Sequence, residues 1–309
     1  MRKDLKSLLA GKLEPWELKL LYKSYDIVGD IAVIRVPESL KQRGEIIAEA
    51  IMQTHKRVKA VWRQVSPVSG DFRLRELEWV AGERKTETVH KEHGCLFKVD
   101  LEKCYFSPRL SYERTRIAEQ VQPGEVVVNM FAGVGCYSIV IAKHSEVKKI
   151  YSIDINPVAV RCMQENVKLN KVEGRVVPVQ GDAKKVVEER LRNIADRIIM
   201  PLPERAYEYL DCAIRSLKQT GGWIHYYDFE HAKKNENPVE KIESKVSEKL
   251  QMLGVDFNVP FGRIVRMTGP NWYQVVLDIE VKRTESGPAR GFNKSFIASQ
   301  FNNTINGRD

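Results

Sequence analysis

The spacing of apolar and polar positions predicts that the second part of the chain folds as an α/β unit. From residue 111 onward, short apolar runs typical of buried strands alternate with segments whose apolar positions recur at the helical period. This alternation predicts a doubly wound, mostly parallel sheet with helices on both faces. The expected strands are 126–130, 149–153, 175–179, 197–200 and 222–228, and the closing strands 257–265 and 272–281 should form an antiparallel hairpin. The expected helices are 113–121, 137–143, 159–169, 184–194, 206–217 and 239–253.

The first third of the chain has a different pattern, which predicts a smaller α+β module with mainly antiparallel strands. Its elements would be helices near 16–22 and 39–56, a hairpin through residue 27 and residues 31–36, and strands at 60–65, 72–80 and 95–99. Residues 284–309 are rich in Gly, Ser and Asn, and we predict a disordered tail there. The expected division is therefore 1–110, 111–283 and 284–309.

One segment carries the pattern of a cofactor site. The apolar run at 126–128 leads into a loop with Gly133 and Gly135, then a helix-like stretch, then a strand that ends on Asp154. This order is typical of doubly wound sheets that bind an adenosine-containing cofactor, because glycines let the ligand approach the backbone and the acid accepts hydrogen bonds from ribose hydroxyls. The other interpretation is an ordinary strand–helix–strand unit with a tight turn.

The loop also limits the kind of cofactor. A dinucleotide loop would carry a third glycine, whereas the three residues after Gly135 are Cys, Tyr and Ser. A phosphate-binding loop would carry Gly-Lys-Ser/Thr, which this loop lacks. The sequence NMFAGVG at 129–135, followed by DINP at 154–157, resembles the S-adenosylmethionine site of class I methyltransferases. Most of those enzymes carry an acid where this chain has Asn129.

Composition and charge narrow the class of protein further. The 309 residues are 43% hydrophobic and 29% charged, as in a soluble globular protein. The net charge of +9 favours an anionic partner, with nucleic acid first. Five cysteines without a C-x-x-C pair favour a reduced, cytoplasmic setting, and no apolar run is long enough for a membrane span. The cluster His90, His93, Cys95 and Cys104 matches no common zinc spacing, so we expect no metal.

The carboxyl ends of the predicted strands add candidates at one edge of the sheet. Asp182 could contact an adenine amino group or cap the following helix. The Pro-Leu-Pro sequence at 201–203 removes backbone donors and stiffens the loop where a substrate would lie. The His-Tyr-Tyr sequence at 225–227 could be catalytic, although aromatic residues at the end of a buried strand more often belong to the core.

Several motifs, in order, resemble one family. The segment 105–114 reads YFSPRLSYER and resembles a signature of the archaeal and eukaryal tRNA (guanine-N1)-methyltransferases, which modify the purine 3′ of the anticodon. The segments 70–75, 131–135, 154–157 and 224–227 match the same family, and the similarity runs from about residue 27 to residue 283. The resemblance implies a Rossmann-like class I methyltransferase fold, S-adenosylmethionine as cofactor and tRNA as partner. It also implies a monomeric, cytoplasmic enzyme that methylates N1 of guanosine 37.

The resemblance also assigns roles to single residues. Glu113 would be the general base that takes the N1 proton, although its pattern alone indicates an exposed acid in the first turn of a helix. Arg73 would stabilise the charge that develops on O6, with Arg75, expected on the same face of one strand, as the register alternative. The implied cofactor contacts are Phe131, Gly133, Gly135, Asp154, Ile155, Asp182 and Pro201. The implied substrate contacts are Arg75, Arg109, Pro203 and Tyr226.

Two departures from the family pattern keep other functions open. This chain has Pro201 where the family carries the Asn of Asn-x-Pro, so an amide that could contact the target base is missing. The chain also starts close to where the N-terminal domain of the longer archaeal members would end. One alternative is a wyosine-pathway enzyme on the same fold, which methylates a carbon of the tricyclic precursor or transfers an aminocarboxypropyl group. The non-enzymatic alternative is a basic RNA-binding protein on a methyltransferase fold.

Overall fold

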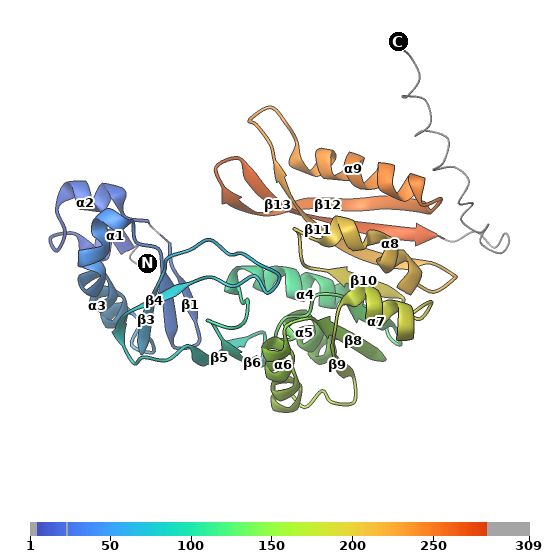
Figure 1. Cartoon of the computed structure of the whole chain (residues 1–309), viewed down its shortest axis with the longest axis horizontal. Helices are drawn as coiled ribbons and strands as arrows, with labels where there is room; N and C mark the ends of the chain where they lie inside the picture. Colours follow the sequence, from blue (N-terminus) through green and yellow to red (C-terminus); the bar gives the residue numbers. More distant parts are fainter. Residues whose placement is uncertain (1–4, 23, 283–309) are drawn as a thin grey trace, which may run out of the picture.

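A seven-stranded sheet forms the centre of the larger part of the molecule (Figure 1). The computed structural model describes residues 5–22 and 24–282. The strand order is β12-β13-β11-β10-β7-β8-β9; β7 to β11 pair in parallel, and β13 runs antiparallel to both β11 and β12. The predicted doubly wound sheet with a closing antiparallel hairpin is confirmed. The strands are β7 Val126–Asn129, β8 Lys149–Asp154, β9 Val176–Gln180, β10 Arg197–Met200, β11 Gly222–His231, β12 Asp256–Gly269 and β13 Trp272–Lys282.

Helices cover both faces of this sheet because successive strand residues point to opposite sides. Val127 and Ile199 pack into one buried cluster with α4, α5 and α6, whereas Val128 and Ile198 pack into another with α7, α8 and α9. Each cluster is built from strand and helix residues that are almost fully buried. The helices are α4 Ser111–Gln120, α5 Cys136–His144, α6 Pro157–Leu169, α7 Ala183–Arg190, α8 Ala206–Ser216 and α9 Pro238–Met252.

The N-terminal module contains a four-stranded sheet in the order β1-β2-β3-β4. β2 and β3 are parallel and the other two pairs are antiparallel, so the expected mainly antiparallel module is confirmed. The strands are β1 Asp26–Val28, β2 Ile31–Ile34, β3 Ala60–Gln64 and β4 Leu77–Gly82. The helices are α1 Leu5–Leu9, α2 Pro15–Leu20, the 3-10 helix η1 Glu38–Arg43 and α3 Gly44–Thr54, so the helix expected at 39–56 is two elements.

The strand predicted at 72–80 begins later than expected. The backbone N–H and C=O groups of Ser69 and Leu74 pair with each other at 2.9 and 3.1 Å and close a turn over 70–73. Arg73 lies in that turn with φ +54°, and β4 starts only at Leu77. The alternation of Phe72 and Leu74 with polar residues imitates a strand, but the turn is set by the paired backbone on either side of it.

A two-stranded hairpin, β5 Glu87–Glu92 with β6 Cys95–Asp100, joins the two parts of the molecule. Only β6 was expected from the sequence. The amides of Asn166, on α6, and Asn170, directly after α6, each donate to and accept from one residue of β6, Lys98 and Leu96 respectively, at 2.6–3.0 Å. These side chains cover the strand edge as a neighbouring strand would.

The hairpin also bonds to the N-terminal module. The backbone N–H of Gly29 donates to Nδ1 of His90 at 3.1 Å, and the N–H of Asp30 donates to Oγ1 of Thr88 at 3.2 Å. The expected division at residue 110 stays a prediction, since this hairpin binds on both sides. The predicted tail at 284–309 lies outside the described residues. Among the described helices, none has the length and apolar character that a membrane crossing requires.

Candidate functional site

The glycine loop between β7 and α5 is held by one carboxylate. Oδ2 of Asp154 accepts the backbone N–H of Gly133 at 2.6 Å, and Oδ1 accepts the N–H of Asn156 at 2.9 Å. Gly133 and Gly135 have φ +56° and +90°, a region that glycine enters without strain. Burial raises the pKa of Asp154, against the two backbone donors. The glycine loop and the end of β8 are therefore held together as one unit.

A cavity of about 420 Å³, here called the strand-end cavity, lies over this unit. Six of the seven expected cofactor residues line it, namely Phe131, Gly133, Asp154, Ile155, Asp182 and Pro201. Gly135 lies behind the lining, where an added Cβ would be 2.9 Å from Cγ of Met163. The sequence pattern thus located the cavity wall but could not separate a lining glycine from a packing glycine.

Asp182 does cap α7. Its Oδ1 accepts the backbone N–H groups of Lys184 and Lys185, so the capping interpretation is confirmed. Its Oδ2 accepts the hydroxyl of Tyr209 at 2.6 Å, and the Tyr209 ring packs edge to face on Phe131. Burial, together with this hydrogen bond, raises the pKa of Tyr209 to about 12. Tyr209 lines the cavity too, from a position that no motif marked.

A second cavity of about 610 Å³, here called the basic cavity, adjoins the first. The two cavities share Val68, Arg73, Tyr105 and Glu204 as lining residues. Segments far apart in the sequence meet here: β1, the ends of β2 and β3, the 105–109 segment, β11 and β12. The arginines that line the basic cavity are Arg35, Arg73, Arg75, Arg109 and Arg266.

The structure separates the two candidate arginines that the sequence could not. Arg73 lines both cavities; its guanidinium lies 4.3 Å from the centre of the Tyr105 ring and 3.0 Å from Oε1 of Glu204. Arg75 lines only the basic cavity and donates to the Gln64 amide oxygen at 3.3 Å. The expectation that both lie on one face of a strand is wrong, because Arg73 is in the turn before β4.

The remaining expected substrate contacts fall in different places. Arg109 lines the basic cavity and pairs with Asp26 at 2.7 Å. Pro203 is buried and lines neither cavity. Tyr226 is fully buried and donates its hydroxyl to Asp228 at 2.7 Å, also away from both linings. The core interpretation of 225–227 is confirmed, because Tyr226 and Tyr227 belong to the two buried clusters and His225 is fully buried.

Glu113, the expected general base, lies outside the linings of both cavities. It is 1% exposed rather than an exposed helix acid. Its Oε2 accepts from Nε of Arg116 and from the hydroxyl of Tyr227, both at 3.0 Å. Its Oε1 lies 3.4 Å from Nε of Arg263, a longer contact than the other two.

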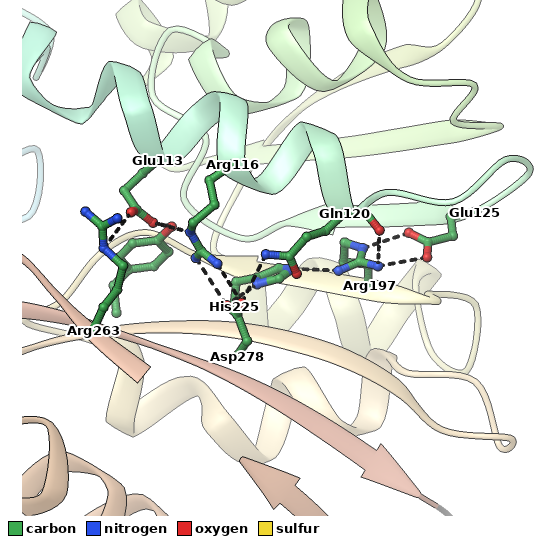
Figure 2. Close-up of polar contacts among 9 residues, drawn as sticks. Glu113, Arg116, Gln120, Glu125, Arg197, His225, Arg263 and Asp278 are labelled. Atoms are coloured by element: carbon green, nitrogen blue, oxygen red, sulfur yellow. Dashed lines mark hydrogen bonds and ion pairs between the residues drawn. The ribbon is translucent and has the colours of Figure 1, made fainter. Parts of the chain in front are cut away.

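Glu113 belongs to a chain of charged residues that Figure 2 shows from Arg263 to Glu125. Arg116 binds both oxygens of Asp278 at 2.6 and 3.1 Å, and Asp278 meets Nδ1 of His225 at 2.6 Å. Arg197 meets Nε2 of His225 at 2.7 Å and binds Glu125 at 2.7 and 2.9 Å. Because Arg197 can only donate, Nε2 of His225 accepts and Nδ1 carries the hydrogen.

Electrostatics fix the charge states in this network. Burial, aided by the nearby Arg197 and Arg116, lowers the pKa of His225 to about 4, so the ring is neutral at pH 7. The pKa of Asp278 is lowered far below its usual range by His225 and Arg116, against the effect of burial. Asp278 therefore stays ionised and holds α4 onto β11 and β13.

Comparison with known proteins identifies the family. Residues 88–253 match the model of the TRM5/TYW2 methyltransferase domain, which is more than half of the chain. The chain belongs to the TRM5/TYW2 methyltransferase family. Residues 5–86 match the TYW2 N-terminal domain, so the two family models meet just before β5.

Characterised TRM5/TYW2 relatives differ in their reactions. The chain is 43% identical to tRNA (guanine(37)-N(1))-methyltransferase Trm5b of Pyrococcus abyssi, over 86% of this chain and 78% of the relative. It is 41% identical to tRNA 4-demethylwyosine(37)-methyltransferase Taw21 of Saccharolobus solfataricus, over 84% and 94%. It is 34% identical to a tRNA(Phe) (4-demethylwyosine(37)-C(7)) aminocarboxypropyltransferase of Methanocaldococcus jannaschii, over 84% and 98%.

Solved structures of the family share the fold and hold its ligands. A complex of aTrm5 with tRNALeu matches with a TM-score of 0.77 at 36% identity, covering 91% of this chain and 79% of that one. Pyrococcus horikoshii TYW2 in complex with MeSAdo matches with a TM-score of 0.73 at 30% identity, covering 91% and 98%. These neighbours confirm the Rossmann-like class I methyltransferase fold preceded by an α+β module.

Sequence reasoning missed Glu204, which lines both cavities, and Arg35, which lines the basic one. Glu204 follows the Pro-Leu-Pro loop directly, so its place after β10 was a usable signal. The sequence gives no local sign that Arg35 and Arg266 share a cavity wall, because one follows β2 and the other lies in β12, more than two hundred residues apart. Arg35 and Arg266 line one cavity because the N-terminal module lies beside the β12–β13 hairpin.

The loop geometry predicts a large difference between two glycines. Gly135→Ala should lower the free energy of unfolding by about 2 kcal/mol or more, because the residue has φ +90° and its new Cβ would press on Met163. Gly174→Ala is the matched control, since nothing lies within 4 Å of its Cβ position, and it should stay within about 0.5 kcal/mol. Urea denaturation measures both; equal effects would contradict the packing role of Gly135.

The buried network predicts that Asp278 stabilises the fold strongly. Asp278→Asn should lower the free energy of unfolding by about 3 kcal/mol, because Arg116 loses the charge of the buried carboxylate that it binds through both oxygens. Glu280→Gln, on the same strand, removes only a solvent-exposed pair with Lys282 and should cost less than about 0.5 kcal/mol. Denaturation midpoints of the two variants test this, and a similar loss in both would show that the network adds nothing specific.

Proposed function

We propose that this chain is an S-adenosylmethionine-dependent tRNA methyltransferase that methylates N1 of guanosine at position 37, beside the anticodon. The observation that carries the proposal is the joining of the strand-end cavity to the basic cavity at Arg73 and Tyr105. A methyl donor in the first cavity and a nucleotide in the second would meet at those two residues. The family relatives with guanine(37)-N(1) activity support this assignment.

The strand-end cavity has the residues that an adenosyl cofactor needs. The carboxylate of Asp154 keeps unused lone pairs that can accept ribose hydroxyls. Apolar walls from Phe131, Ile155 and Pro201 suit the faces of an adenine ring. When bound, S-adenosylmethionine supplies an electrophilic sulfonium methyl. The neighbour crystallised with MeSAdo supports the same use of the site.

Arg73 has the position that charge stabilisation requires. Guanine N1 must lose its proton to attack the methyl, and negative charge then develops on O6. A guanidinium at the junction can hydrogen-bond this oxygen, and its value is greatest where water is excluded. The Arg73 side chain is only 15% exposed, and the Tyr105 ring fixes its plane. Glu204 occupies the guanidinium now, so substrate binding would exchange that ion pair for the contact with O6.

Glu113 remains the proposed base, on the strength of the family motif. Its carboxylate lines neither cavity, and two arginines and one tyrosine contact it. To take the N1 proton, it would have to give up the contact with Arg263, the longest of the three. Arg263 is partly exposed and lies over the Tyr112 ring, so it has room to move away.

A labelled-cofactor assay tests the proposal. The protein should transfer methyl to a tRNA transcript with G at position 37, and not to one with A, with the product identified by nucleoside mass. Arg73→Ala should reduce kcat about 10²–10³-fold and Glu113→Gln about 10²–10⁴-fold. Arg190→Gln, at the exposed far end of α7, is the charge-matched control and should leave kcat unchanged.

Two further measurements separate a catalytic role of Glu113 from a structural one. For a base, Glu113→Gln keeps the affinity for S-adenosylmethionine and the thermal stability while kcat falls. For a structural residue, cofactor affinity and thermal stability fall together with kcat. Full activity of the Gln variant would rule out the proposed base, and no methyl transfer to any tRNA would overturn the function itself.

A second candidate reaction is C-methylation of the tricyclic wyosine precursor at the same tRNA position. Pro201 favours this reaction, because a cavity wall without the Asn amide does not require a matching hydrogen-bonding group on the edge of the base. The similarity to Taw21, which spans nearly the whole of that relative, favours it as well. Incubation with tRNA carrying 4-demethylwyosine should then give a methylated nucleoside. An aminocarboxypropyl product would instead assign the third reaction of the family.

The proposed setting is the cytoplasm, where the chain would act as a monomer on tRNA. All five cysteines are free and buried, which suits a reducing compartment. Because these thiols are already buried within one chain, no partner chain is needed to shield them from solvent, which suits a monomer.

A further inference from the structure

The basic cavity contains more positive charge than its own acids can pair. Its acidic lining residues are Asp26 and Glu204, and both are already engaged. Asp26 pairs with Arg109 at 2.7 Å, and Glu204 pairs with Arg73 at 3.0 Å. Within residues 5–22 and 24–282, the other three arginines of the lining have no carboxylate partner. These are Arg35, Arg75 and Arg266.

Neutral groups hold two of these three guanidiniums in place. Arg75 donates to the amide oxygen of Gln64 at 3.3 Å. Arg266 donates to Gln274 at 2.8 Å, to Oγ of Ser107 at 3.3 Å and to the Tyr105 hydroxyl at 3.5 Å. Such bonds fix the direction of a guanidinium without cancelling its charge. Hydrogen-bond capacity remains on each, since an arginine has five donors.

Like charges crowd around Arg75 in particular. Burial lowers the pKa of Arg75 against the opposing effects of Asp26 and Tyr105, and the nearby Arg35 and Arg109 add to the lowering. A charged group taken out of water beside others of the same sign is costly unless a counterion joins it. The cavity wall therefore favours an anionic ligand over water.

We propose that the basic cavity binds a backbone phosphate of RNA through Arg75 and Arg266, with Arg35 at its rim. This inference rests on the proposed function, because the junction with the strand-end cavity is where the target base would lie. A cavity of about 610 Å³ exceeds what an isolated phosphate fills, and it continues into the neighbouring site. A nucleotide can therefore extend from the junction with its phosphate toward the three arginines.

The apolar part of the wall suits the same ligand. Tyr22, Phe229 and Met267 line the basic cavity beside the arginines, and they offer surfaces for a ribose or a flanking base. Tyr105 links the proposed phosphate contact to the proposed catalytic arginine. Its hydroxyl accepts a hydrogen bond from Arg266, and its ring lies under the Arg73 guanidinium. A phosphate on Arg266 would thus steady the ring that orients the proposed catalytic arginine.

Salt dependence of tRNA binding tests the phosphate contact directly. Affinity of the full chain for a tRNA transcript is measured from low to high salt, for the wild type and for Arg75→Gln and Arg266→Gln. Each lost phosphate contact should reduce the slope of log K against log salt by about 0.7–0.9. Affinity should fall equally for transcripts with G or A at position 37, because phosphate contacts carry no sequence information. Arg190→Gln should leave the slope unchanged.

The outcomes separate this inference from the proposed function. Unchanged slopes in both variants, with wild-type binding and methyl transfer intact, would overturn the phosphate site alone. A wild type that binds no tRNA would overturn the proposed function, and the site with it. If inorganic phosphate bound in an Arg75-dependent way without any change in the tRNA slope, the cavity would be a free-anion site instead. Affinity for S-adenosylmethionine, measured on each variant, confirms that the fold is retained.

Discussion

The buried carboxylate of Asp278 is the interaction on which the arrangement of this site depends. It lies on the antiparallel strand β13 and binds Arg116 of α4 with both oxygens, while His225 of β11 approaches it at 2.6 Å. A buried ion is tolerated only when charges and hydrogen bonds surround it, so these three elements have one low-energy arrangement. Since α4 follows the 105–110 segment directly, seating α4 also places Tyr105 and Arg109 at the cavities.

The candidate catalytic groups are divided between two environments. Arg73 and Tyr105 lie where the two cavities join, and Arg73 is held there by an ion pair with Glu204 and by the Tyr105 ring. Glu113 lies in the buried network, where its contacts serve the fold as well.

The elements of the larger domain follow closely from the sequence, whereas the smaller module shows what a pattern can conceal. Strand and helix periods are local properties, and the parallel strands and their helices occur close to where the periods place them. Arg73 is the instructive failure, because alternation around Phe72 resembled a strand. The turn is held by Ser69 and Leu74, whose pairing is a matter of backbone geometry that side-chain patterns do not report.

The sequence by itself determined the fold class, the cofactor loop with Gly133 and Asp154, and the motifs that resemble one family. Those features depend on residues close together in the chain, so spacing is enough to recognise them. Only the tertiary structure decided which residues share a wall. Arg35 and Arg266 line one cavity, whereas Glu113 and Tyr226 are buried outside both cavity linings. Arg73 lines both cavities and Arg75 only one. Burial and charge pairing arise from contacts between distant segments, and no local pattern encodes them.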